Sequence, residues 1–219
     1  MTTSGTNTFA PEIAELIDEA FERCGVEPAA LTARHLRSAR MSLNLLFVEW
    51  ATKGIHLWAV EQQTTTLTAS DPTYNTPTNL ITVLEMVVRR SGIDTPVWPM
   101  SRDVYLAIPD KTSEGLPSQY WLDRDATQPV ITLWDVPENS TDSIVYFYMR
   151  RAQDAGSSSK TPDTPYHAYE ALTAGLAARL AVKYAADRIG PLRGDEARQF
   201  KLFDTEDRER APTRMRVRY

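Results

Sequence analysis

The chain has 219 residues, of which 42% are hydrophobic and 24% are charged, a composition typical of a globular protein that can bury a sizeable core. Its formal net charge is −5, from 24 Lys and Arg residues against 29 Asp and Glu residues. Proteins that hold nucleic acid through its phosphates are usually basic, so this balance disfavours tight, generic DNA binding.

The N-terminal part is predicted to be helical. Pro11 suits the first position of a helix, and Gly25 suits its C-terminal cap. Between them, apolar residues recur at the spacing of one helix face: Ile13, Leu16, Ile17, Ala20, Phe21 and Cys24. A second, longer helix is expected to begin at Pro28 and to end near Lys53.

Three arginines, Arg34, Arg37 and Arg40, recur every third residue near the start of this second helix. One interpretation of this basic ridge is a solvated face. The other is a surface that contacts acidic neighbours, among which the acidic first helix is a candidate.

A block of β-favouring runs follows. Leu57–Ala69 lacks helical periodicity, and Leu80–Arg90 is β-branched and apolar, as in a central strand. Val97-Trp98 is expected to form a short strand, and Ser101 to cap a short helix. The most strand-like runs are separated by turn-rich segments and predict an antiparallel meander: Gln119–Leu122, Val130–Trp134 and Ile144–Met149.

The C-terminal part is predicted to be helical again. Ala155–Pro165 has the composition of a flexible linker. A long alanine-rich helix of about 36 Å is expected over Tyr166–Ile189, with Gly190-Pro191 as its stop. Such a helix should be buried, in the core or between subunits, and Gly175 would allow a close approach of a neighbouring backbone. A shorter helix is expected over Asp195–Arg210.

The end of the chain differs from the rest, because Pro212 breaks the helix and the residues beyond alternate strictly between basic and apolar or aromatic side chains. These residues are Arg214, Met215, Arg216, Val217, Arg218 and Tyr219. A period of two is that of a strand, and such a tail can add to a sheet of another chain. The alternative is a solvated basic tail.

No catalytic, metal or cofactor site is predicted. His35, His56 and His167 are scattered, and none has a second ligand type at metal spacing. Phosphate-binding glycine loops and a GxSxG motif do not occur. Asp123 and Asp125 share one strand face, but the turn beside them favours a hairpin corner over a carboxylate pair. The five tryptophans are interpreted as packing residues, with a stacking platform as the alternative.

Four stretches, taken in order, resemble the head-to-tail adaptor proteins of tailed bacteriophages, the group of tail tubular protein A and head-completion proteins. The first runs from PEIAELIDEAF at residue 11 through the KGIHLW transition. The second is MSRDVYLAIPDKTSEGLPSQYWLDRD, the third is VITLWDVP, and the fourth is the alanine-rich LTAGLAARLAVKYA. Together they cover most of residues 11–187.

The resemblance implies a structural protein of the virion neck, made in the host cytoplasm, that has no cofactor and no chemistry of its own. Such proteins form a ring, usually a dodecamer, that binds the portal protein above and a tail or stopper protein below. Double-stranded DNA passes through the ring during packaging and ejection without specific binding. An acidic protein suits this channel, because a strongly basic wall would hold a duplex that carries one charge per ~1.7 Å. No membrane is involved.

The resemblance also implies contact residues. The C-terminal segment of the family commonly reaches the portal, which corresponds here to Arg214–Tyr219. Subunit interfaces in such rings are large. We expect them to involve the alanine-rich helix and the first helix. The individual residues expected there lie in the alanine-rich helix and the basic ridge: Leu172, Gly175, Leu176, Arg179, Leu180, Arg34, Arg37 and Arg40.

The sequence thus predicts an α+β fold, in which a helical frame carries an inserted antiparallel β domain. The expected parts are an N-terminal helical part (1–56), the β domain (57–152), a linker with C-terminal helices (153–205) and an extended tail (206–219). Two alternatives to the adaptor stay open. One is another tail or baseplate module, such as a stopper or a glycan-binding protein. The other is a hydrolase that uses His35 or His167 with a carboxylate.

Overall fold

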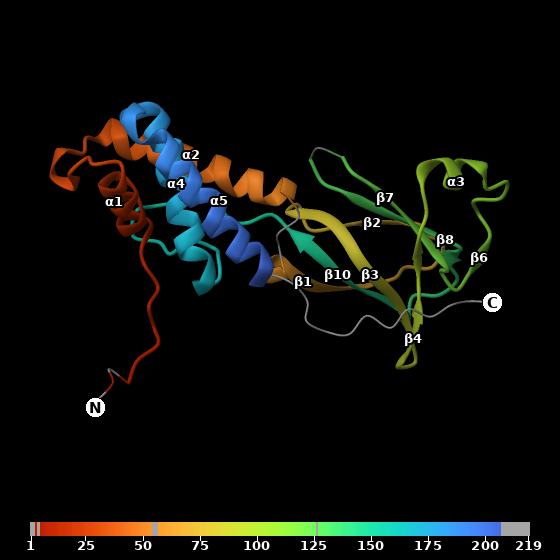
Figure 1. The fold of residues 1–219 in the computed structure, drawn as a ribbon. Helices are drawn as coiled ribbons and strands as arrows, with labels where there is room; N and C mark the ends of the chain where they lie inside the picture. Colours follow the sequence, from red (N-terminus) through yellow and green to blue (C-terminus); the bar gives the residue numbers. More distant parts are fainter. Residues whose placement is uncertain (1–2, 4, 54–56, 126, 207–219) are drawn as a thin grey trace. The chain divides into compact units, whose positions relative to one another are not determined.

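The structure, a computed structural model, describes residues 3, 5–53, 57–125 and 127–206. Its helices and its largely antiparallel sheets confirm the predicted α+β class. The chain divides into two compact units (Figure 1). The helical unit comprises Met1–Trp58 and Ala152–Tyr219, and the β unit comprises Ala59–Arg151.

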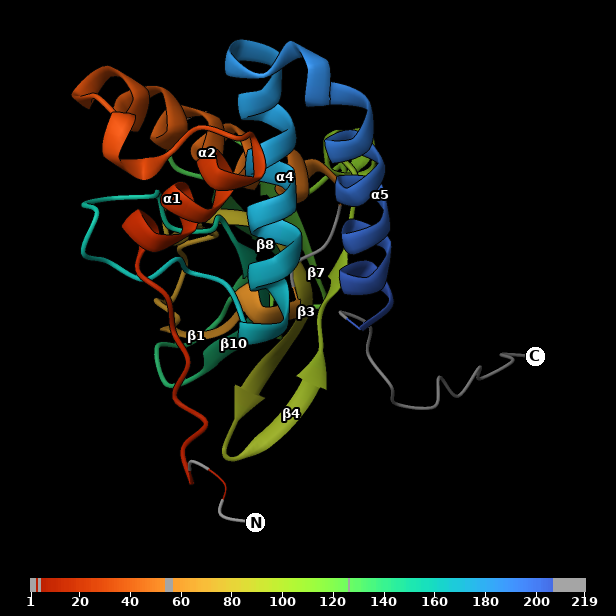
Figure 2. The ribbon, with the colours of Figure 1, turned by 60° about the vertical axis from the view of Figure 1, so that its left-hand side comes forward.

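In the described part of the helical unit there are four α-helices. They are α1 (Ile13–Arg23), α2 (Ala33–Lys53), α4 (Tyr169–Tyr184) and α5 (Ile189–Glu206). Short 3₁₀ turns precede three of them, at Pro28–Ala30, Tyr166–Ala168 and Ala186–Arg188, and another lies at Leu57–Ala59. Helix α4 lies between α1 and α5 in Figure 2, and it also packs against α2.

Helix α4 is the buried centre of this unit. Ten of its 16 residues are buried, and most of these are small, so the surrounding helices pack close to its backbone. The closest approach is at Gly175, where a Cβ atom would lie 2.9 Å from Cδ2 of Leu46 in α2. The expected close approach at Gly175 therefore exists, with a leucine side chain as the neighbour.

The ends of α1 follow from its sequence. After the helix, Gly25 adopts a φ of 77°, which a residue with a side chain rarely adopts. The amide of Val26 donates to the carbonyl of Phe21 (3.0 Å), and the amide of Gly25 donates to that of Glu22 (2.8 Å). This pair of bonds is a Schellman cap, so the predicted stop at Gly25 is confirmed.

The segment Ala155–Pro165 is not the flexible linker that its composition suggests. The amide of Ile13 donates to the carbonyl of Lys160 (2.8 Å). The amide of Ala14 donates to the carbonyl of Ser158 (3.0 Å). Both amides belong to the first turn of α1, where a helix leaves its N–H groups without internal partners. The segment therefore caps α1, which composition alone does not reveal.

The long helix predicted over Tyr166–Ile189 is in fact two helices. Helix α4 ends at Tyr184, and Ala185 leaves the helical region with φ −147° and ψ 65°. The predicted stop, Gly190-Pro191, lies instead inside the first turn of α5. Proline is tolerated there because the N–H it lacks would have no helical partner.

Helix α2 begins at Ala33 rather than at Pro28. Pro28 starts a separate 3₁₀ turn, which ends at the extended residue Leu31. The amide of Thr32 then donates to Nδ1 of His35 (3.1 Å), and the amide of His35 donates to Oγ1 of Thr32 (3.5 Å). This reciprocal arrangement is that of a capping box, and it gives His35 a structural role.

The β unit contains two four-stranded sheets and a two-stranded ladder. The first sheet has the order β1 (Val60–Thr66), β10 (Ser143–Arg150), β3 (Leu80–Arg90) and β4 (Ile93–Pro96). The second has the order β2 (Thr73–Asn75), β8 (Val130–Trp134), β7 (Gln119–Asp123) and β5 (Trp98–Pro99). The ladder joins β6 (Glu114–Gly115) to β9 (Val136–Pro137), and α3 spans Arg102–Ala107.

The predicted meander is wrong, although its strands exist. Strands β7 and β8 pair with each other, but β10 pairs with β1 and β3 in the other sheet. Alternate residues of β10, such as Ile144 and Tyr146, share one core with Ile131 and Leu133 of β8. Two other predictions are confirmed: β3 is central in its sheet, and the hydroxyl of Ser101 caps α3.

The packing at Gly175 can be tested by substitution. Gly175→Leu places a side chain where Leu46 already lies, and overpacking of this kind costs about 1–3 kcal/mol. Urea denaturation followed by circular dichroism measures the loss. The control is Gly194→Leu in α5, where nothing lies within 4 Å of the added Cβ and loss of a helical glycine stabilises slightly. Equal destabilisation by both substitutions would contradict the account.

Candidate functional site

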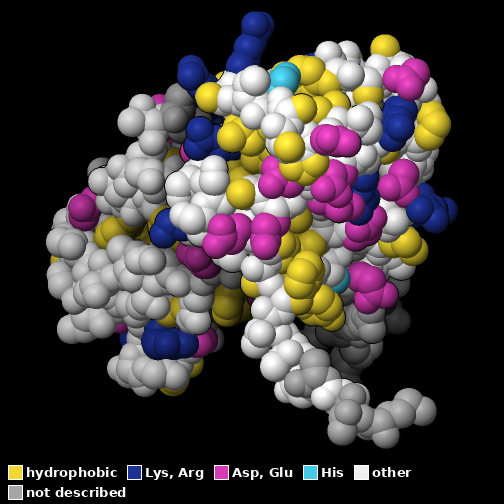
Figure 3. Space-filling model, turned by 90° about the vertical axis from the view of Figure 1, so that its left-hand side faces the viewer, with side chains coloured by type: hydrophobic (Ala, Val, Ile, Leu, Met, Phe, Trp, Pro, Cys, Tyr) yellow, Lys and Arg dark blue, Asp and Glu magenta, His cyan; other side chains and the backbone are white. Residues whose placement is uncertain are grey.

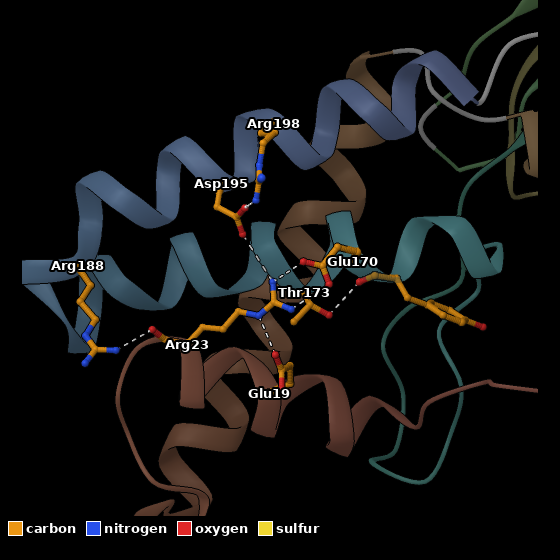
Figure 4. A network of polar contacts seen from close by, with 8 residues as sticks. Glu19, Arg23, Glu170, Thr173, Arg188, Asp195 and Arg198 are labelled. Carbon is orange, nitrogen blue, oxygen red and sulfur yellow. Dashed lines mark hydrogen bonds and ion pairs between the residues drawn. The ribbon is translucent and has the colours of Figure 1, made fainter.

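A network of polar contacts in the helical unit surrounds the guanidinium group of Arg23 (Figure 4). Both oxygens of Glu170 accept from its two Nη atoms, at 2.8 and 2.9 Å. Its Nε atom donates to Glu19 at 2.9 Å, and Asp195 lies 3.7 Å from Nη1. The group therefore ties α1 to α4 and α5, and we call it the Arg23 clamp.

The position of each charge in the clamp follows from its place on a helix. Arg23 lies in the last turn of α1, where the helix dipole favours a cation. Glu170 lies in the first turn of α4, where the dipole favours an anion. Arg23 is also the one basic residue of α1, a signal in the sequence that could have identified it.

The Arg23 clamp has a structural role. The hydrogen bonds with Glu170, and then those with Glu19, raise the pKa of Arg23 above its already high value, although burial opposes this. The guanidinium group thus stays charged and has no proton to exchange at neutral pH. Nearby, Arg188 donates to the carbonyl of Arg23 at 3.2 Å. Its guanidinium carbon would lie 2.7 Å from a Cβ atom at Gly25, which adds a packing reason for that glycine.

A second charged cluster joins α2, α4 and α5. Glu49 accepts from Lys53 at 2.6 Å and from Arg179. The hydrogen bond from Lys53 is the largest cause that lowers the pKa of Glu49. Burial raises the pKa of Glu196, and the charge of Glu49 raises it further. Lys53 also lies 4.1 Å from the ring centre of Phe200.

A groove of about 550 Å³ opens between α1 and the start of α4. Its charged lining residues are Glu15 and three members of the clamp, Arg23, Glu19 and Glu170. Apolar and aromatic residues make up most of the rest of the lining: Phe9, Pro11, Leu16, Tyr166 and Tyr169. Because its arginine is already paired, the groove suits an apolar side chain better than a small anion.

The nucleophiles and bases considered from the sequence do not form a catalytic site. Cys24 is buried, its thiol lies 3.4 Å from the carbonyl of Ala177, and burial raises its pKa. His35 belongs to the cap of α2, and the exposed ring of His167 contacts Phe203. His56 lies outside the described residues. Among the residues that are described, no group of three potential metal ligands occurs.

The remaining candidates in the β unit are structural too. Asp123 and Asp125 are exposed at the β7–β8 corner, where Asp125 accepts from the amide of Thr127 at 3.2 Å. Trp121 stacks on Tyr105, with ring centres 5.2 Å apart. The other tryptophans are dispersed: Trp50 is in the helical core, Trp58 donates to the carbonyl of Asp163, Trp134 donates to that of Asp110, and Trp98 is exposed.

The residues expected at subunit interfaces fall into two groups. Leu172, Leu176 and Leu180 are fully buried in the core of their own chain, and Gly175 contacts Leu46. These four residues have no free surface for a neighbour. The side chain of Arg179 contacts Glu49 within the chain.

The basic ridge keeps its free surface. Arg34 and Arg37 are exposed, and within the described residues neither makes a hydrogen bond or ion pair. Arg40 donates to the carbonyl of Gly156 at 3.1 Å. The expected portal-binding residues Arg214–Tyr219 lie outside the described residues.

One surface feature was not recognised in the sequence. Met41, Leu45 and Val48 are exposed on α2, at the spacing i, i+4 and i+7. This spacing is a second apolar row on a helix whose first row is buried. The spacing of the three residues could be read from the sequence, but the buried apolar stripe of α2 already accounted for a helix there.

Comparison with known families identifies the kind of protein to which these surfaces belong. The profile of the SU10 adaptor protein family matches residues 11–218, almost the whole chain. The chain belongs to this family. The resemblance drawn from four stretches of sequence is thereby confirmed, and the protein is a phage adaptor, which points to a structural rather than an enzymatic role. No curated protein matches the chain.

In the described part of the chain, no helix is long and apolar enough to cross a bilayer.

The Arg23 clamp predicts a stability effect. Arg23→Met leaves Glu170 and Glu19 without their cation and should lower the free energy of unfolding by about 1–3 kcal/mol. The control is Arg198→Met, because Arg198 also pairs with Asp195 but is 70% exposed. Exposed pairs contribute ~0–1 kcal/mol. A loss for Arg23→Met no larger than the control's would contradict the clamp.

Glu196 predicts a pH dependence. Because the pKa of Glu196 is raised in the folded state, the ionised carboxylate destabilises that state at neutral pH. This destabilisation fades as the pH falls through the raised pKa and the carboxyl group becomes protonated. Glu196→Gln should therefore increase the free energy of unfolding at pH 7, and the gain should vanish below pH ~4. Urea denaturation at both values measures it. A gain that persists in acid would contradict this cause.

Proposed function

We propose that this protein is the head-to-tail adaptor of its virion neck. Copies of the chain form a dodecameric ring that binds the portal protein and receives the tail or a stopper protein. Double-stranded DNA passes through the ring during packaging and ejection. The observation that carries this proposal is the family match over residues 11–218.

The character of the helical unit supports a mechanical role. Its helices are joined by a buried core, by the Arg23 clamp and by the cap that residues 158 and 160 provide for α1. Figure 3 shows acidic side chains gathered across one face of this unit. An acidic surface does not hold the phosphates of a passing duplex, which suits a channel protein.

Light scattering of the purified protein, alone and with its portal protein, tests the proposal. A ring alone, or a monomer that forms a large stoichiometric complex on the portal, is the expected result. A monomer that ignores the portal would contradict the neck role. In that case binding of labelled glycans and assays of His35→Ala and His167→Ala variants would test the other tail modules and the hydrolase.

The basic–apolar tail predicts a docking defect. Deletion of Thr213–Tyr219 removes the alternating segment that we propose adds to the portal protein as a strand. The shortened protein should keep its circular dichroism spectrum and its melting temperature but lose its complex with the portal in light scattering. Normal incorporation of the shortened protein into particles would contradict strand addition.

A further inference from the structure

The outer face of α2 begins with basic residues and continues with apolar ones. Between residues 34 and 52, every exposed residue of α2 lies on one helical face: Arg34, Arg37, Met41, Leu45, Val48 and Thr52. Met41, Leu45 and Val48 are 60%, 51% and 62% exposed. We call Arg34, Arg37, Met41, Leu45 and Val48 the α2 outer row.

Among the helices that the structure describes, only α2 exposes three large apolar side chains in one row. On α1 and at its N-cap, every exposed residue is a glutamate: Glu12, Glu15, Glu19 and Glu22. Helix α2, in contrast, buries one apolar row in the core and exposes a second. Three large apolar side chains in register on an exposed helix face are typical of a helix that packs against a partner.

The charges of the row define its partner. Arg34 and Arg37 have no ion pair in the described chain, and the exposed part of the row contains no carboxylate. A complementary partner must therefore combine an apolar depression with acidic residues beside it.

The chain itself carries such a surface. The groove between α1 and α4 is lined by Phe9 and Tyr166, which are 77% and 79% exposed, and by Leu16. Glu15 and Glu19 of the acidic face of α1 also line it. Glu19 already accepts from Arg23 and Glu15 accepts from the amide of Glu12, each through one oxygen, and both residues are exposed. The groove thus offers aromatic surface to the apolar side chains and the other carboxylate oxygens to the arginines.

We propose that the α2 outer row of one copy packs into the α1–α4 groove of a second copy. The two surfaces share no residue, so the contact is heterologous. Each copy can use its α2 outer row on one neighbour and its α1–α4 groove on the other. Heterologous contacts of this kind extend into a closed ring or a filament. The inference rests on the proposed ring and names the surfaces that build it.

Cross-linking of engineered cysteines tests the contact. Leu45→Cys and Tyr166→Cys are combined in one chain, both at exposed positions, while the native Cys24 is buried. The protein is assembled with its portal and treated with a short bismaleimide. The double variant should give a ladder of covalent multimers, and each single variant should give none.

The other patterns overturn the proposal. A dimer from Leu45→Cys alone would mean that the row pairs with itself. A cross-link from Leu45→Cys to another virion protein would mean that the row binds a different partner. If normal rings form but no ladder appears, the proposed contact is wrong and the proposed ring still stands. If the unmodified protein does not assemble, the proposed contact and the proposed ring are both wrong.

A charge placed in the row provides a second measurement. Leu45→Glu sets a carboxylate against the glutamates of the groove and should raise the concentration for half-maximal assembly at least about tenfold. The matched control is Leu202→Glu, because Leu202 is 60% exposed on α5 and lies outside both surfaces. An equal effect of the two substitutions, or no effect of Leu45→Glu, would overturn the proposal.

Discussion

The burial of α4 is the constraint on which the helical unit depends. A helix of mainly small residues can be buried only if its neighbours come close, and α1, α2 and α5 do so. Close packing brings charged residues of three helices together at one end, where Arg23 neutralises the carboxylates of Glu170 and Asp195. Without this pairing, the approach of the acidic α1 to those carboxylates would be repulsive.

The same constraint explains where function can lie. Among the described residues, His35 caps α2, the ring of His167 contacts Phe203, and Cys24 is packed in the core. What remains free is the surface: the acidic face of α1, the aromatic groove beside it and the α2 outer row. An adaptor acts through contacts rather than through chemistry, and its distinctive residues are accordingly on the outside.

Local features of the fold could be predicted from the sequence because their physics is local. The cap at Gly25 requires a positive φ, the cap at Ser101 requires one hydroxyl, and the bounds of β8 follow from a run of β-favouring residues. The pairing of β10 with β1 and β3 depends on register between distant strands, which the order of the strands does not determine.

Other features were missed because one sequence signal permits two structures. Gly190-Pro191 can end a helix or occupy its first turn, and the break at Ala185 decides between them. The polar composition of residues 155–165 predicts the absence of regular structure but not the hydrogen bonds that cap α1. The alanine-rich helix was equally suited to a core or to an interface, and its Leu172, Gly175, Leu176 and Leu180 are buried in the core of their own chain.

The central claim is that this chain is a structural neck protein whose copies meet through surfaces of the helical unit. An electron cryo-microscopy map of the neck in intact virions tests it most directly. The account predicts a ring of these chains below the portal, with each α2 outer row covered by the α1–α4 groove of the neighbouring copy. A neck without this chain, or a ring in which the row faces open solvent, would contradict it.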